Sequence, residues 1–295
     1  MNGKVSIIGG GHVGMSAAFA MLLKNTVREL VLFDRDTEKM KGEQLEFEHS
    51  LTFLGTTKVT VAKSYKDLKN SDVIVFTAGR AQLPGESRLN LVKSNLEVIK
   101  TILPEVIEYS PDSVIIMVTN PVDILTYQAS KLLKLPPGRI FGTGTSLDSA
   151  RFRFHLSEFL GINPKNIHAY VLGEHGDSSF PIAISTLQDI SSEKIKEAFL
   201  KTKSAASTII AAKGSTYYAI GVVINQLVDA VLRDTKRVYP VSIPLIGQYG
   251  YHDVSISVPC VIGKNGVEKI LEVPLSDEEK KLMDKSVKIL KEIIY

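Results

Sequence analysis

A glycine-rich turn near the N-terminus, G-G-G-H-V-G at residues 9–14, constrains the fold of this chain more than any other segment. The turn follows an apolar strand-like run and opens a helical pattern, which is the context that a G-x-G-x-x-G phosphate-binding turn requires. In that spacing Gly9 allows the tight turn, Gly11 lets the backbone approach a pyrophosphate, and Gly14 lets the helix pack closely on the strand. The segment therefore predicts a strand–turn–helix unit whose helix N-terminus binds a dinucleotide.

The alternation of strands and helices continues through the first half of the chain. Strand-like runs are expected at residues 4–9, 29–34, 72–79 and 113–119, and helices at 13–24, 38–51, 88–109 and 122–134. This order is typical of a parallel sheet covered by helices on both faces. We therefore expect an α/β fold with a Rossmann doubly wound parallel sheet, which forms a dinucleotide-binding domain in residues 1–142.

The rhythm changes from about residue 142. Helices are expected at residues 146–160, 193–212, 214–231 and 277–294, and strand-like runs at 167–172, 237–243, 255–263 and 267–271. Ser276 is expected to cap the last helix. We therefore expect a second domain of mixed α+β structure in residues 143–295, which the resemblance described below makes the substrate and catalytic domain. Because no Gly/Ser-rich linker separates the two halves, we expect them to pack tightly.

Composition and charge argue against several classes of function. The net charge of +3 comes from Lys and Arg residues scattered among Asp and Glu, whereas nucleic-acid binding needs a clustered basic face. No apolar run reaches the length of a membrane span, and we expect no signal or transit peptide. Cys260 is the single cysteine, so a reducing, cytoplasmic location is expected. Cys260 and the six histidines form no ligand-like cluster, so no metal is expected.

An acidic residue indicates which dinucleotide is bound. Asp34 ends the second strand, twenty residues beyond Gly14, where a carboxylate binds the ribose hydroxyls. Because this carboxylate would repel a 2′-phosphate, NAD is favoured over NADP, and Arg35 is the counter-argument because an arginine can accept a phosphate. His12 is expected to be a solvated loop residue.

A second motif, G-E-H-G-D at residues 173–177, places His175 in a glycine-flanked turn after a strand-like run. Asp148 and Arg151 lie three residues apart on one face of an expected helix, and Arg88 follows a loop with Pro and Gly. A base, a carboxylate that orients it and two guanidinium groups are what the oxidation of a 2-hydroxy acid requires. The alternatives are a packed core histidine, a helix-capping Asp148 and a surface Arg151 paired with that carboxylate.

Several short strings occur in register along the chain, and in order they are G-G-G-H-V-G, T-A-G-R-A-Q-L-P-G-E-S-R, V-T-N-P-V-D, L-D-S-A-R and G-E-H-G-D. With this order and spacing, almost the whole chain resembles the lactate/malate dehydrogenase family. The resemblance implies a Rossmann half followed by a mixed α/β substrate half, NAD as the cofactor, and assembly into a homotetramer, with a dimer as the alternative.

The resemblance also implies a role for individual residues. His175 is the acid/base catalyst and Asp148 orients it, while Arg151 binds the substrate carboxylate in a two-point fork. Arg88 stabilises the reacting oxygen and Asn120 hydrogen-bonds the same atom. The residues expected to bind the cofactor are Gly9, Gly11, Val13, Gly14, Asp34, Lys39, Tyr65, Ala78, Gly79, Thr119, Asn120 and Ile220.

Gln82 occupies the loop position that, by resemblance, distinguishes the substrates of this family. Malate enzymes have Arg there to pair the second carboxylate, whereas lactate enzymes have Gln, which leaves an extra charge unpaired at a cost of several kcal/mol. Thr216 and Ile220 also match lactate enzymes. Arg80 is the complication, because two positions from Gln82 in an extended segment it lies on the same side. Pyruvate and L-lactate are favoured, and oxaloacetate and malate stay open.

Arg153 and His168 match, by resemblance, the positions where bacterial lactate dehydrogenases bind fructose bisphosphate between subunits. Arginine offers a permanent fork for phosphate and histidine a pH-dependent contact, although both residues could be ordinary solvated side chains.

Two other classes of protein compete with a dehydrogenase. An NAD-dependent glycosidase would need metal ligands, and a non-catalytic NAD-binding protein would be expected to lose the catalytic set.

Overall fold

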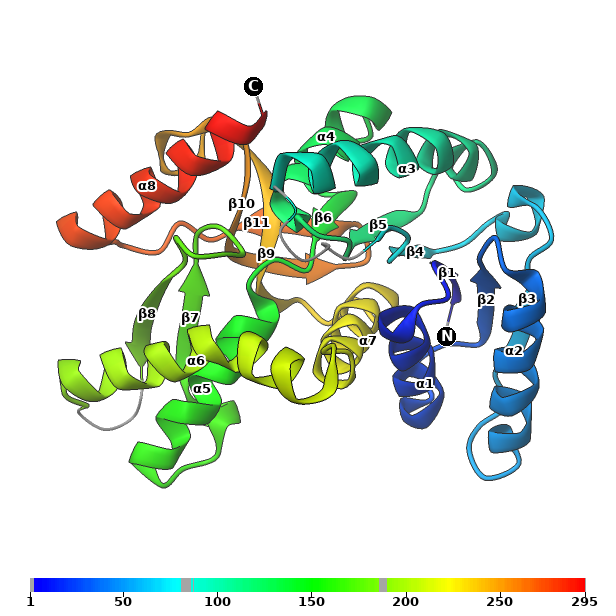
Figure 1. Ribbon diagram of the computed structural model, residues 1–295, viewed down its shortest axis with the longest axis horizontal. Coiled ribbons are helices and arrows are strands. Elements are labelled where there is room, and N and C mark those ends of the chain that lie inside the picture. Colours follow the sequence, from blue (N-terminus) through cyan, green and yellow to red (C-terminus); the bar gives the residue numbers. More distant parts are fainter. Residues whose placement is uncertain (1–2, 81–85, 87, 186–189, 295) are drawn as a thin grey trace.

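The computed structural model describes the chain except for residues 1–2, 81–85, 87, 186–189 and 295. Its centre is a sheet in which the strands follow the order β11-β10-β9-β6-β5-β4-β1-β2-β3 (Figure 1). Strands β1 to β6 pair parallel with one another, whereas β9 pairs antiparallel with β6, and β9, β10 and β11 pair antiparallel in turn. The bounds are β1 Lys4–Ile8, β2 Glu29–Phe33, β3 Lys58–Val61, β4 Val73–Phe76, β5 Val114–Met117, β6 Ile140–Gly142, β9 Arg237–Ile246, β10 His252–Gly263 and β11 Gly266–Ile270.

Helices cover both faces of the parallel strands, with α3 and α4 on one face and α1 and α7 on the other (Figure 1). The packing of β4 (Val73–Phe76) explains why all its residues are apolar. Val73 and Val75 pack into the cluster that holds α1 and α7, while Ile74 and Phe76 pack into the cluster that holds α3, as expected for a strand buried on both faces. The predicted fold class is therefore confirmed. The helix bounds are α1 His12–Lys24, α2 Thr37–Leu51, α3 Arg88–Tyr109, α4 Val122–Leu133 and α7 Tyr218–Leu232.

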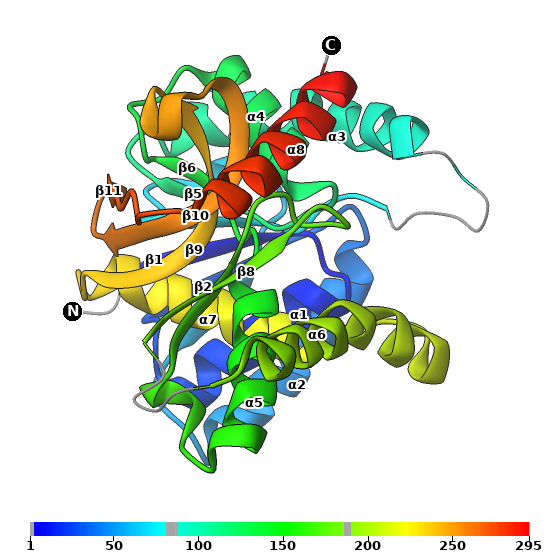
Figure 2. The same cartoon turned by 90° about the vertical axis from the view of Figure 1, so that its left-hand side faces the viewer.

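The remaining elements lie around the antiparallel end of the sheet, with α8 at one side and α5 and α6 at the other (Figure 2). Helix α5 packs on α6 and on the two-stranded sheet of β7 and β8. Helix α8 contacts α4, β8 and β10. The predicted cap of α8 is present, because the Glu279 N–H donates to the Ser276 hydroxyl at 3.2 Å and the Ser276 N–H donates to the Glu279 carboxylate at 2.7 Å. The bounds are α5 Ser146–Leu160, β7 His168–Leu172, β8 Phe180–Ser185, α6 Ser192–Lys213 and α8 Asp277–Ile294.

Three strands were not predicted from the sequence, namely β3, β6 and β8. Strand β3 is a short edge strand with half its residues polar, β6 has three residues, and β8 contains Pro181, so each lacks a strong strand pattern. The predicted start of α7 at residue 214 is wrong by four residues. Gly214 instead ends α6 with a φ of +84°, a left-handed conformation that favours glycine.

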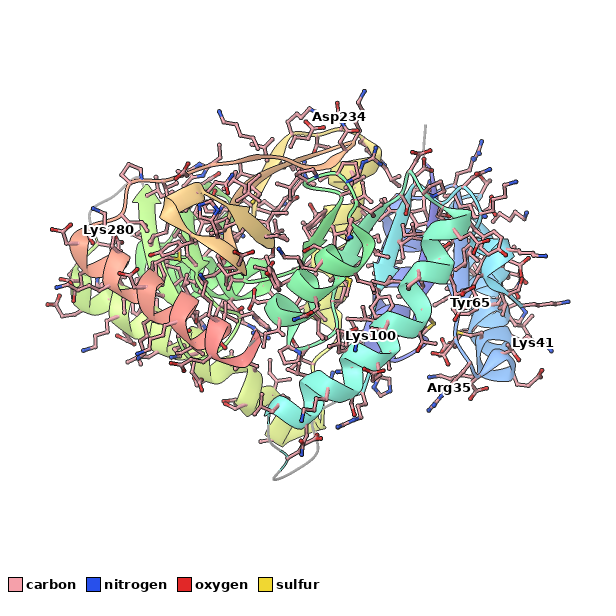
Figure 3. All side chains as sticks on the ribbon, turned by 90° about the horizontal axis from the view of Figure 1, so that it is seen from above. Arg35, Lys41, Tyr65, Lys100, Asp234 and Lys280 are labelled. Carbon is pink, nitrogen blue, oxygen red and sulfur yellow. The ribbon has the colours of Figure 1, made fainter. Side chains whose placement is uncertain are left out.

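The central sheet passes without interruption from one half of the chain to the other. Gly142 at the end of β6 pairs with Ser242 of β9, so strands from both sides of the predicted boundary at residue 142 share one hydrogen-bonded sheet. Figure 3 shows the two ends of the resulting molecule, with Arg35 and Tyr65 at one end and Lys280 of α8 at the other. No helix within the described ranges is long and apolar enough to cross a membrane.

A close contact between α1 and α7 makes the packing of the two halves sensitive to one methyl group. A Cβ atom added at Gly221 would lie 2.8 Å from the backbone carbon and 2.9 Å from the backbone oxygen of Ser16. Gly42 offers a matched control, because it also lies inside a helix but nothing lies within 4 Å of an added Cβ atom.

We expect Gly221→Ala to lower the free energy of unfolding by about 1–3 kcal/mol through overpacking. We expect Gly42→Ala to raise it by about 0.5–1 kcal/mol through helix propensity. Urea unfolding of both variants and the unchanged protein at one protein concentration measures the two effects. Equal stability of the two variants would show that α1 and α7 do not need the glycine.

Candidate active site

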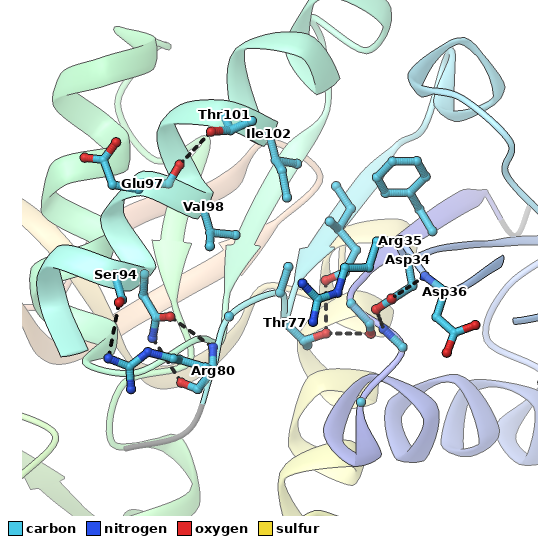
Figure 4. Close-up of a pocket in the computed structure, with 18 of the residues that line it drawn as sticks. Asp34, Arg35, Asp36, Thr77, Arg80, Ser94, Glu97, Val98, Thr101 and Ile102 are labelled. Atoms are coloured by element: carbon cyan, nitrogen blue, oxygen red, sulfur yellow. Dashed lines mark hydrogen bonds between the residues drawn. The ribbon is translucent and has the colours of Figure 1, made fainter. Parts of the chain in front are cut away.

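A cleft of about 880 Å³ lies at the carboxyl ends of β1, β2 and β4 (Figure 4). Strand order reverses here, because the chain leaves β1 toward β2 and β3 on one side and later adds β4, β5 and β6 on the other. Open α/β sheets bind ligands at such a switch point. The predicted cofactor residues that line this cleft are Gly9, Gly11, Asp34, Lys39, Tyr65, Ala78 and Gly79, whereas Val13, Gly14, Thr119, Asn120 and Ile220 are not among its lining residues.

Of the three motif glycines Gly9, Gly11 and Gly14, two are closely packed and one faces open space. An added Cβ atom would lie 2.6 Å from the Ala78 nitrogen at Gly9, which has a φ of +112°, and 2.2 Å from the Gly9 oxygen at Gly14. At Gly11 nothing lies within 4 Å. Gly11 is also the N-cap of α1 and makes no side-chain cap, so the helix N-terminus is open to a pyrophosphate, as NAD binding requires.

Asp34 is held in place by backbone amides. Its Oδ2 accepts the Gly10 N–H at 2.6 Å and its Oδ1 accepts the Asp36 N–H at 3.0 Å. Lys39 donates to the Gly10 carbonyl at 2.7 Å, which fixes the turn from the side of α2. The carboxylate thus stands at the cleft in a fixed orientation, where a ribose with two free hydroxyls fits better than one with a 2′-phosphate.

Helix α3 supplies the wall of the cleft that faces Asp34, and sequence analysis did not single out its residues. Asn95 is buried; its Oδ1 accepts the Arg80 N–H at 3.0 Å and its Nδ2 donates to the Asn120 carbonyl at 2.8 Å. Asn95 therefore joins the segments that follow β4 and β5. The sequence does contain a signal for Asn95, because this polar residue interrupts an apolar stripe that includes Val92 and Ile99 at helical spacing.

Arg80, the complication for substrate choice, is engaged by an acidic residue. Its guanidinium forms a two-point ion pair with Glu86, with one contact at 2.6 Å, and a hydrogen bond to the Ser94 hydroxyl at 3.2 Å. Figure 4 shows the side chain directed toward Ser94 on α3. The positive charge of Arg80 is therefore balanced within the chain itself.

The second motif forms a turn between β7 and β8 that presents His175. Its Nδ1 lies 2.7 Å from Asp148 Oδ2, and Asp148 Oδ1 accepts from Arg151 at 3.1 Å. Asp148 does not cap α5, because the N-cap is Thr145. Since the carboxylate can only accept, Nδ1 carries the proton and Nε2 remains for proton exchange. The structure thus brings together three of the residues predicted to be catalytic.

Burial and charge act in opposite directions on the pKa values of His175 and Asp148. Burial lowers the pKa of His175, but the charge and hydrogen bond of Asp148, together with the charge of Asp123, outweigh burial, so the pKa is raised above its ordinary value. Burial raises the pKa of Asp148, but the charges and hydrogen bonds of His175 and Arg151 outweigh it, so the pKa is lowered. The pair therefore favours a protonated imidazole beside an ionised carboxylate.

The other predicted substrate residues are less completely described. Gln82 lies outside the described residues, and Arg88 begins α3 without a described side chain. Asn120 accepts the Val122 N–H at its Oδ1 at 3.3 Å. Thr216 lies between α6 and α7, and Ile220, in the first turn of α7, packs against the core. The assignment of substrate contacts to these residues stays a prediction.

The two residues predicted to bind an effector lie on adjacent elements. Arg153 of α5 donates to the Ala169 carbonyl of β7 at 3.3 Å and lies 6.0 Å from the centre of the Tyr170 ring. His168 is exposed at the start of β7. Among the described residues, no group of three or more His, Cys, Asp and Glu side chains could hold a metal ion.

Models of a protein family match both halves of the chain. Residues 3–142 match the lactate/malate dehydrogenase NAD binding domain, and residues 145–295 match the lactate/malate dehydrogenase alpha/beta C-terminal domain. The chain therefore belongs to the lactate/malate dehydrogenase family, and its cofactor is NAD. Gly11, Asp34 and Lys39 of the cleft fit that cofactor.

Individual relatives cover nearly the whole chain. The L-lactate dehydrogenase of Thermoanaerobacterium saccharolyticum is 43% identical over 305 residues, with 99% of this chain and 98% of the relative covered. L-lactate dehydrogenase 1 of Clostridium acetobutylicum is 42% identical over 309 residues, with 99% and 97% covered. The crystal structure of a lactate dehydrogenase from a Medee basin deep-sea metagenome library is 37% identical, with a TM-score of 0.94 and 99% and 98% covered.

The geometry predicts how His175 responds to the loss of its carboxylate. We expect Asp148→Asn to lower the pKa of His175 by about one unit or more, because the charge that outweighs burial is removed. The pH dependence of the imidazole NMR signals measures the shift. Glu158→Gln is the control, because Glu158 pairs with a different histidine, His155 of α5, at 2.9 Å. An unchanged or raised pKa in Asp148→Asn would contradict the arrangement.

Proposed function

We propose that this chain is an NAD-dependent L-lactate dehydrogenase, which interconverts pyruvate and L-lactate. The observation that carries the proposal is the hydrogen-bonded, partly buried pair of His175 and Asp148, with Arg151 beside it, in a chain whose N-terminal half is an NAD-binding domain. The names of its relatives support the same substrate.

The chemistry of the site follows from the protonation of His175. Bound NADH supplies the hydride that reduces the keto carbon, and the product alkoxide needs a proton. His175 donates that proton from Nε2, and in the oxidation of lactate it accepts the proton back. Asp148 holds the imidazole in the required tautomer and stabilises the imidazolium. Because its pKa is raised, His175 stays protonated and can donate this proton.

The substrate carboxylate requires a fixed cation. Arg151 lies one helical turn from Asp148, and their contact at 3.1 Å holds the guanidinium beside His175. A two-point fork to the carboxylate would orient the keto group toward the imidazole. Arg88 and Asn120 are proposed to contact the reacting oxygen, and Thr216 to line the substrate pocket, as the family resemblance implies.

The preference for a substrate with one carboxylate rests on charge. Gln82 is neutral, so at its position it would not balance the second carboxylate of oxaloacetate. Arg80, which could have done so, is paired with Glu86. Malate dehydrogenase activity is the second candidate, and its support was that same arginine.

We expect kcat/KM for NADH oxidation to be about 100-fold higher with pyruvate than with oxaloacetate, which corresponds to about 2.7 kcal/mol. Initial rates with each keto acid at saturating NADH measure this ratio. Arg80→Ala is the matched variant, and it should leave the ratio unchanged because Arg80 is paired with Glu86. A higher kcat/KM for oxaloacetate would overturn the lactate assignment, and a selective loss of oxaloacetate activity in Arg80→Ala would place that residue in substrate choice.

A homotetramer in the cytoplasm, working in glycolysis and fermentation, is proposed as the setting of this activity. Large apolar side chains are exposed on the outer faces of α1, α2 and α7, which is the property of a surface that another subunit covers. A dimer is the alternative assembly. The exposed residues are Phe19, Leu23, Leu45, Tyr218 and Val222.

Fructose bisphosphate is proposed as an allosteric effector at Arg153 and His168. Arg153 lies against β7 where His168 begins that strand, so both side chains could contact one phosphate. We expect the sugar bisphosphate to lower KM for pyruvate by about tenfold and Arg153→Gln to remove the effect. Steady-state rates with and without effector test this. An unchanged KM in the unmodified enzyme would end the proposal without affecting the catalytic assignment.

A further inference from the structure

A second carboxylate, which is buried, contacts His175 from a different helix. Asp123 lies in the first turn of α4, is 1% exposed, and accepts the backbone N–H of His175 at its Oδ2 at 2.7 Å. Asp148, by contrast, contacts the imidazole ring from α5. Buried carboxylates are costly and persist only where they are paired or hydrogen-bonded. The hydrogen bond to the backbone of His175 therefore accounts for a carboxylate at this buried position.

A neutral group supports the same turn from α8. The Ser286 hydroxyl accepts the Glu174 N–H at 3.3 Å and donates to the Ser178 carbonyl at 2.8 Å. At Gly173 a Cβ atom would come within 2.6 Å of this hydroxyl. The turn is thus held by a carboxylate from α4 and by an uncharged hydroxyl from α8, and the two supports can be separated by mutation.

Asp123 differs from Ser286 because its charge acts on the imidazole. Burial raises the pKa of Asp123 to about 6, and the charge of Glu174 adds to the rise, while the Ser242 hydroxyl and the amide and charge of His175 oppose it. The charge of Asp123 in turn raises the pKa of His175. Above about pH 6 the carboxylate is ionised, and it then favours the protonated imidazole.

Other charged groups also face the imidazole. Asp148 favours its protonated form and Arg151 of the same helix disfavours it. Glu174 precedes His175 in the turn and acts on Asp123. The groups contributed by β9 and α8, Ser242 and Ser286, are neutral.

We propose that Asp123 is a positioning residue that fixes the main chain of His175 and, as a second carboxylate, stabilises its protonated imidazole. The inference rests on the proposed function, in which His175 donates a proton to the reduced keto acid. Asp148 then acts on the ring directly, and Asp123 acts through the backbone and through space. The consequence is unequal for the two directions of reaction, because only reduction needs the imidazolium.

Asp123→Asn separates charge from hydrogen bonding, because its amide oxygen can still accept the His175 N–H. We expect the alkaline limb of the pH profile of kcat/KM for pyruvate reduction to move to lower pH by about one unit. The sign follows from the loss of a charge that raises the pKa of His175. Lactate oxidation, which needs the neutral imidazole, should keep its rate on the alkaline side.

Two companion variants identify the cause. Asp123→Ala should show the same shift and, in addition, a lower kcat at every pH, because the hydrogen bond to His175 is also lost. Ser286→Ala removes an uncharged support of the same turn, so it should lower thermal stability and leave the alkaline limb in place. An unshifted limb in Asp123→Asn, or an equal shift in Ser286→Ala, would overturn the role of the charge.

An NMR titration of the unmodified enzyme tests the contact between Asp123 and His175 without a variant that must fold and without an activity assay. The ¹⁵N–¹H signal of the His175 backbone amide should titrate with a midpoint near pH 6, because Asp123 accepts that proton. A signal that does not respond near this pH would overturn the proposal. Absence of pyruvate reduction together with this titration would instead refute the proposed function and leave the contact of Asp123 intact.

Discussion

The hydrogen bond between His175 and Asp148 depends on how closely α5 is fixed to β7. Ser149, next to Asp148, accepts the Val171 N–H at 2.8 Å, and Thr145 donates to the Val171 carbonyl. These contacts set the register between the helix that carries the carboxylate and the strand that leads to the histidine. The 2.7 Å contact between this carboxylate and the imidazole is then a consequence of how helix and strand are paired. The shifted pKa values of both groups depend on that short distance.

The nucleotide cleft rests on a different constraint, which is the reversal of strand order between β1 and β4. Because both strands end at the same edge, the turn at Gly9 and the segment at Ala78 meet there, and Thr77 donates to the Gly9 carbonyl at 2.9 Å. Asn95 then links the ends of β4 and β5 from α3. The dinucleotide site is therefore built by the sheet, with few side chains needed beyond Asp34 and Lys39.

Sequence patterns predicted the parts of the structure that are local or that carry a motif. Four of the six parallel strands and the glycine-rich turn belong to this group, because spacing and residue type specify them. The pairing of His175 with Asp148 was instead implied by the resemblance to a family. The continuity of the sheet was not predicted, because it depends on Gly142 meeting Ser242, a hundred residues away. Asp123 was also missed. A carboxylate in the first turn of a helix is ordinary, and only the tertiary structure places it on His175.

The support that α8 gives to the catalytic turn has a consequence for synthesis of the protein. Ser286 contacts Glu174 and Ser178 from the last helix of the described chain. A ribosome that has translated the first 270 or so residues has already made every side chain of the proposed catalytic set. The turn around His175 nevertheless lacks one of its two buried supports until the final helix emerges and docks, so a prematurely terminated polypeptide would carry the reactive groups without the scaffold that orders them.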